Sequence, residues 1–150
     1  MLLDALLSWL HITAILVLAS TLGAEALLMR AQRGPATLAA LARADLIYGI
    51  SAALVLLTGL ARLHAGAHGA AFLTANPVFW TKMALFVVIG LLSILPTVRF
   101  IQWRRAQRTD AAFWPAEAEF VRVRRLVFAE LHLLAFVPLA AALMARGIGA

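Results

Sequence analysis

The fold is decided by residues 2–29, which have the sequence LLDALLSWLHITAILVLASTLGAEALLM. The only ionisable residues in this run are Asp4, His11 and Glu25, and it ends at Arg30. A helix crosses the hydrocarbon core of a bilayer with about 20 apolar residues, so this segment is long enough. It lacks a positively charged start and is too long for the apolar part of a signal peptide. We therefore predict a retained transmembrane helix.

Three further apolar segments span residues 46–63, 77–98 and 126–145. Only helices and closed barrels satisfy their backbone hydrogen bonds in lipid, and continuous apolar runs lack the alternation of barrel strands. Short connections favour antiparallel neighbours. The sequence thus predicts an all-α integral membrane protein, a four-helix up-down-up-down bundle forming one transmembrane domain over residues 1–150.

The composition agrees with a protein that lives in the lipid bilayer. Of the 150 residues, 64% are hydrophobic and 13% are charged, whereas soluble domains are about half apolar and about a quarter charged. The absence of cysteine excludes disulfides, thiolate metal sites and thiol nucleophiles. The net charge of +6 comes from residues that flank the apolar runs. Topology and anionic lipid explain that charge, so we expect no nucleic-acid partner.

The basic residues also predict the orientation of the chain. Ten of the thirteen lie in the first and third connections, which share one side of the membrane: Arg30, Arg33, Arg43, Arg99, Arg104, Arg105, Arg108, Arg122, Arg124 and Arg125. Because positive loops stay in the cytoplasm, both termini and the loop of residues 63–76 should be periplasmic or extracellular. We expect a multi-pass protein of the bacterial cytoplasmic (inner) membrane.

Turn residues indicate where the helices begin and end. Gly34-Pro35 marks the first break, and Asn76-Pro77 opens the third helix with proline in its first turn. The third connection, residues 102–125, mixes both charges. Its second half is predicted to form the amphipathic start of the fourth helix.

Ionisable residues inside a span are expensive, so each one is a candidate for a functional site. Asp45, Tyr48, Gly59 and Arg62 share one face of the second helix. His11 enters the membrane from the same side as Arg62 and Lys82. A cluster of these three residues in the outer half is therefore possible.

A second candidate group lies on the fourth helix. His132 is about 9 Å in from the cytoplasmic edge, which leaves it about 7–12 Å from His11 along the membrane normal. Glu130 points about 160° away from His132. Glu130 and Glu25 lie near the cytoplasmic side, where they can relay protons or pair with Arg125 and Arg30, and pairing is favoured.

This set of residues suits haem b. An iron porphyrin needs an imidazole on a fixed helix, an apolar slot and cations for its two propionates. His11 is the candidate axial ligand, Lys82 and Arg62 the candidate propionate or substrate partners, and His132 a second metal ligand or a separate site. The simpler interpretation is that both histidines only pack and that the two cations reach to the interface.

The chain resembles a family of bacterial four-span membrane proteins catalogued as a domain of unknown function. The similar stretches are LLDALL at residues 2–7, ARADLIYG at 42–49, NPVFWTKM at 76–83 and ALMARG at 142–147. This likeness covers nearly the full length and implies the four-span fold.

A more distant resemblance is to the HemJ-type protoporphyrinogen oxidases and the CopD-like membrane proteins. It is carried by His11, Arg30, Gly59, and Trp80 followed by Lys82. The likeness implies haem b held by His11 and oxidation of a tetrapyrrole. The chain departs from that pattern because only Thr81 separates the tryptophan from the lysine.

These observations lead to two hypotheses of different kinds. The first is a haem b-binding redox protein that transfers electrons and oxidises a small apolar molecule such as a porphyrinogen or a quinol. The second is a non-catalytic accessory subunit or scaffold, packed beside other membrane subunits or in a homo-oligomer. The sequence names no catalytic residue for either.

Overall fold

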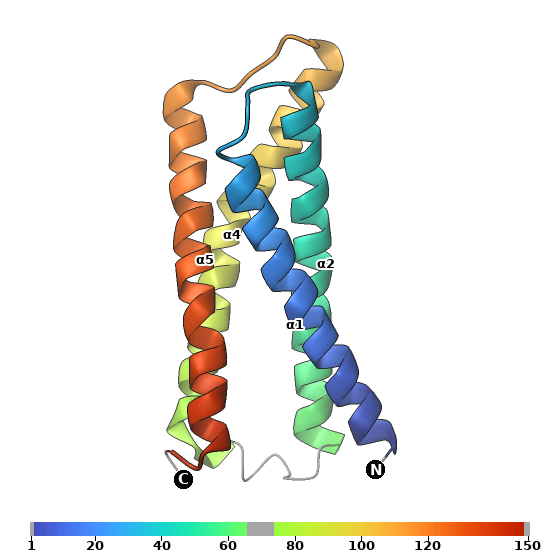
Figure 1. Ribbon diagram of the computed structural model, residues 1–150, viewed down its shortest axis with the longest axis vertical. Helices are drawn as coiled ribbons and strands as arrows, with labels where there is room; N and C mark the ends of the chain where they lie inside the picture. The colour runs from blue at the N-terminus through green and yellow to red at the C-terminus, as the bar shows by residue number, and fades with distance from the viewer. Residues whose placement is uncertain (1, 66–73, 149–150) are drawn as a thin grey trace.

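The computed structural model describes residues 2–65 and 74–148. The long helices are α1 (Leu2–Leu28), α2 (Pro35–Ala65), α4 (Pro77–Thr109) and α5 (Glu117–Ala145). Consecutive helices run in opposite directions (Figure 1). All four are long and apolar enough to cross a membrane. The predicted all-α, four-helix membrane bundle is confirmed.

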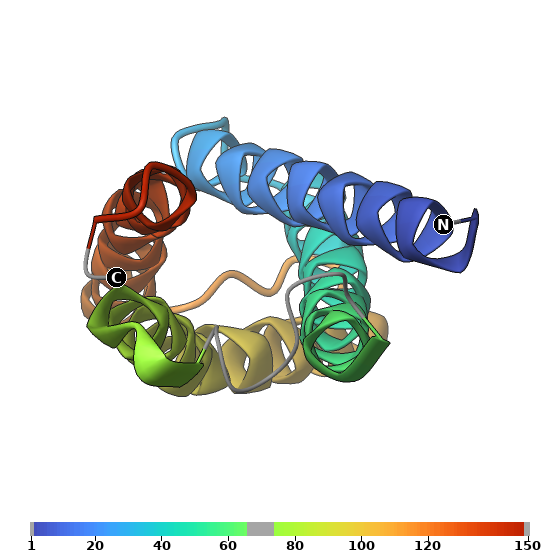
Figure 2. The same ribbon diagram turned by 90° about the horizontal axis from the view of Figure 1, so that it is seen from below.

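The helices form a ring in which each has two neighbours (Figure 2). The most extensive packing is between α1 and α2 and between α4 and α5, the pairs adjacent in sequence. Packing of α2 on α4 and of α1 on α5 closes the ring. The N-terminal half of α1 slants away from α5, so its closest partner there is α2 (Figure 1).

The predicted break at Gly34-Pro35 and the predicted helix start at Asn76-Pro77 are both confirmed. α2 begins at Pro35, directly after Gly34. At the start of α4, the Asn76 side chain accepts a hydrogen bond of 2.8 Å from the backbone N–H of Val78, which satisfies one of the free donors of the first turn. Proline at position 77 has no N–H to satisfy and its φ already suits a helix.

Three helices extend beyond the predicted spans at the arginine-rich end. α2 begins eleven residues before Leu46. Residues 102–109, predicted as connection, continue α4, so that part of the prediction is wrong, whereas α5 does start in the second half of that segment. Apolar length determines what crosses lipid. It does not determine where a helix ends, because packing sustains the turns outside the bilayer.

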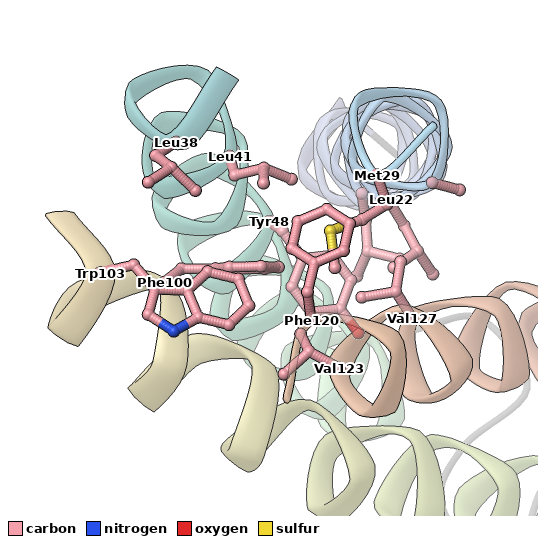
Figure 3. Close-up of a cluster of buried hydrophobic side chains, with 12 residues drawn as sticks. Leu22, Met29, Leu38, Leu41, Tyr48, Phe100, Trp103, Phe120, Val123 and Val127 are labelled. Carbon is pink, nitrogen blue, oxygen red and sulfur yellow. The ribbon is translucent and has the colours of Figure 1, made fainter. Parts of the chain in front are cut away.

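That packing forms the hydrophobic core of the bundle (Figure 3). Its fully buried members include Leu22, Leu41, Phe100, Val123 and Val127, drawn from all four helices. The core therefore joins the two helix pairs near the arginine-rich end.

The outer surface of the bundle is apolar. Leu27 on α1, Leu57 on α2, Leu91 on α4 and Phe136 on α5 are each more than half exposed. A soluble protein would hide side chains of this size, and patches this extensive mark an interaction surface. Lipid is the partner that suits an apolar surface present on every helix.

Candidate functional site

His11 is half-buried on α1, where its ring faces α2. Its Nδ1 lies 2.8 Å from the hydroxyl oxygen of Thr58, whose own hydroxyl donates to the carbonyl of Leu54 at 2.6 Å. A hydroxyl has one hydrogen, so the hydrogen between Thr58 and His11 must come from the imidazole. Nδ1–H therefore donates to Thr58, and in the neutral ring Nε2 carries the lone pair.

A glycine provides the space for this ring. A Cβ atom at Gly59 would lie 3.3 Å from Cε1 of His11, tighter than ordinary van der Waals contact. Residue 59 follows Thr58 directly, so α2 offers both a hydrogen-bond acceptor and the room for the imidazole in one turn. The sequence placed Gly59 on the polar face of α2, but only the structure pairs it with His11.

Arg62 and Lys82 are the cations whose charges act on His11. Lys82 lies 5.3 Å from the centre of the Phe79 ring. The Nε atom of Arg62 is buried and has no hydrogen-bond partner in the described part of the chain. Three of the four predicted site residues, from α1, α2 and α4, thus lie near enough for their charges to act on one another.

His132 does not join this group. Its ring is exposed on α5, and Nδ1 faces the carbonyl of Phe128 in the same helix. Glu130 is 1% exposed and points into the bundle. Because a helix turns about 100° per residue, an inward Glu130 turns residue 132 outward. The ring of His132 is therefore not directed toward His11.

The ion pairs predicted for Glu25 and Glu130 are wrong. Across residues 2–65 and 74–148 the salt bridges are Arg33 with Glu117 and Arg99 with Glu119, both at the arginine-rich end. The guanidinium of Arg30 lies instead over the Phe128 ring, 4.7 Å from its centre. Sequence proximity suggested the pairs, but both carboxyl groups turn into the bundle.

Glu25, Asp45 and Glu130 form a second polar site. The sequence pointed to each of these acids but did not predict that they lie together. Glu25, Asp45 and Glu130 are 2%, 6% and 1% exposed, and they come from α1, α2 and α5. Both other carboxyl groups are near enough to Glu25 to act on it electrostatically. The signal available in the sequence was that each acid lies within an apolar segment.

Hydroxyl groups complete the acidic site. The Tyr48 hydroxyl donates to Oε2 of Glu130 at 3.3 Å, and the Thr97 hydroxyl donates to Oδ1 of Asp45 at 2.7 Å. Thr97 lies on α4, so all four helices contribute. Oε1 of Glu25 and Oε1 of Glu130 are buried and have no hydrogen-bond partner among the described residues.

A groove of about 500 Å³ lies beside this second site, between α1 and α5. Its walls include the small residues Ser20, Gly23 and Ala24, with Arg30 and Phe128 also lining it. His11 is not among its lining residues. Leu27, another lining residue, is 71% exposed, so the groove opens on the outer surface between the two helices.

Four apolar helices with polar groups gathered at two interior positions define a multi-pass membrane protein. The chain belongs to the family described as "Predicted membrane protein (DUF2214)", whose sequence profile matches residues 3–149. No curated protein and no solved structure gives a significant match. The distant likeness to HemJ-type and CopD-like proteins stays a prediction.

Proposed function

We propose that this membrane protein binds haem b at His11 and transfers electrons. The observation that carries the proposal is the hydrogen bond from Nδ1 of His11 to Thr58. Histidines that ligate metals donate their other ring N–H to a fixed acceptor, which sets the tautomer and the orientation of the ring. The arrangement leaves Nε2 of His11 as the ligating atom.

The neighbouring cations fit the rest of such a cofactor. A haem carries two propionates, and Arg62 and Lys82 supply two positive charges near the imidazole. The Nε atom of Arg62 has no acceptor among residues 2–65 and 74–148, which supports an anionic partner there, because a buried donor without an acceptor is costly. Bound haem would supply one-electron chemistry at its iron.

The residues around His11 would position the haem and select its substrate. Thr58 holds the imidazole, Gly59 leaves room for it, and the two cations attract carboxylate groups. The apolar side chains exposed on α1 and α2 would meet molecules dissolved in the bilayer. We therefore propose a small apolar reductant, such as a porphyrinogen or a quinol, as the substrate.

An optical spectrum of the purified protein in detergent tests the proposal. After haem is supplied, the wild-type protein should show a Soret band that His11→Ala abolishes. His132→Ala is the matched control and should keep the band, because that ring is exposed on α5. Replacing Arg62 by Gln should weaken haem binding about tenfold, the effect of about 1.4 kcal/mol from one lost charged hydrogen bond.

Two results would count against the haem proposal. One is a wild-type protein that retains no haem. The other is a Soret band that is identical in His11→Ala. Co-purification with another membrane protein at a fixed ratio, without pigment, would instead favour an accessory subunit.

We further propose that the protein lies in the bacterial cytoplasmic membrane, with its arginine-rich connections inside and both termini outside. The sequence has no cysteine, so single cysteines report position cleanly. In intact cells, an impermeant maleimide should label Ile148→Cys and leave Gln32→Cys unlabelled until the cells are opened. Both side chains are exposed. The reverse labelling pattern would invert the proposed topology.

A further inference from the structure

We propose that the buried acidic site is a proton-binding site centred on Glu25, separate from the site at His11. Glu25 is 2% exposed, and its Oε1 is buried without a hydrogen-bond partner in the described part of the chain. A buried carboxylate oxygen in this state lacks both water and a donor. A proton on the carboxyl group removes the charge and supplies a hydrogen to donate.

The charges around Glu25 favour the neutral acid. Arg30 follows the end of α1, but its guanidinium lies over the Phe128 ring. α2 contributes Asp45 and Tyr48, and α5 contributes Glu130, so the titratable groups facing Glu25 from its neighbours are acidic.

Burial of these acids makes their full ionisation costly. Removing a single ion from water costs several kcal/mol even after the protein relaxes, unless an opposite charge compensates it. Three carboxylates in one interior would also repel one another. At least one of them must therefore be neutral or be neutralised by a bound cation.

The geometry favours a proton over a metal cation. Calcium takes six to eight oxygen ligands, and magnesium requires a near-octahedral set at short distance. Across the described residues, no three His, Asp or Glu side chains lie close enough to hold a metal ion. A proton needs only one carboxyl oxygen, and the buried Oε1 of Glu25 provides it.

The site has features of a store that exchanges its proton. Tyr48 and Thr97 each hold one neighbouring carboxyl by a hydrogen bond, whereas the described residues offer no such bond to Oε1 of Glu25. Glu25 lies fourteen residues from His11 on α1, about 21 Å along the helix. Proton binding here therefore stands whether or not His11 holds a haem.

Infrared spectroscopy of the full-length protein in phosphatidylcholine vesicles, at neutral pH in potassium buffer, tests this proposal. The wild-type protein should show the carbonyl stretch of a protonated carboxyl group, and the band should shift in deuterated water. Glu25→Gln should remove the intensity of one carboxyl group. Glu117→Gln, which alters an exposed acid paired with Arg33, is the matched control and should leave the band unchanged.

Further variants and conditions keep the result decisive. Glu25→Asp retains a protonatable group and should restore the band at a changed frequency. This variant therefore tests the proposal even if the Glu25→Gln protein does not fold. Helical circular dichroism reports folding of each variant. Absence of the band in the wild type, or its persistence in folded Glu25→Gln, would overturn the proposal. Loss of the wild-type band when sodium replaces potassium would also overturn it, since sodium would then be the bound cation.

Discussion

Gly59→Leu is expected to push the imidazole of His11 off Thr58 and to disrupt the packing of α1 on α2. Even a Cβ atom at residue 59 would lie 3.3 Å from Cε1 of the histidine, and a leucine adds three more carbons. Overpacking of this kind costs about 1–3 kcal/mol. Under the haem proposal, the same substitution should abolish the Soret band, because the ligand loses the bond that orients it.

Gly49→Leu is the matched control on the same helix. A Cβ atom there would meet nothing within 4 Å, so the new side chain points into open space. Leucine also favours a helix over glycine by up to about 1 kcal/mol, and this variant should be at least as stable as the wild type. Thermal unfolding in detergent and a haem titration measure both variants. Equal behaviour of the two would contradict a specific contact between Gly59 and His11.

Trp103→Ala is expected to cause a large loss of stability. The Trp103 indole is 2% exposed, stacks on Phe120 with ring centres 5.8 Å apart, and meets Phe100 edge-on at 5.6 Å. Its Nε1–H donates to Glu119 at 3.1 Å. Truncating a buried tryptophan leaves a cavity and costs about 3–5 kcal/mol.

The position of Trp103 is the reason to expect the upper part of that range. Residue 103 lies beyond the apolar span of residues 77–98. Water surrounds the bundle there, so apolar side chains that lose their contact with Trp103 become exposed to water. Trp9→Ala is the control, because that side chain is 64% exposed and should change stability by no more than about 0.5 kcal/mol. The free energy of unfolding from denaturant titration in mixed micelles compares the two. A similar loss in both variants would place the stabilising core elsewhere.

The two polar sites share one helix. Asp45 and Tyr48 belong to the acidic site, whereas Thr58 and Arg62 belong to the His11 site, and all four lie on the inward face of α2. Helical spacing made that face predictable, since residues three and four apart project to the same side. Which residue of another helix each one meets depends on how the helices tilt and slide. Periodicity contains no such information.

His132 and Glu130 also show that helical spacing does not predict which residues face the interior of the bundle. The sequence predicted an angle of about 160° between residues 130 and 132, but it did not show which of the two faces the interior. Either residue could have faced the interior, and the haem hypothesis placed the histidine there. In the structure Glu130 takes the interior position and accepts a hydrogen bond from Tyr48 across the bundle. The choice depends on an acceptor and a donor 82 residues apart.

Local sequence was enough to predict four apolar helices long enough to cross a membrane, the first break between them and the start of α4. Those properties depend on local apolar length and on turn residues such as Gly34 and Asn76, each of which acts within a few positions. Contacts between helices determine that Glu25 turns away from Arg30, that His11 fits against Gly59, and that α4 continues through residue 109. These outcomes depend on packing between helices distant in sequence, where a small rotation of one helix exchanges its buried residues for its exposed ones.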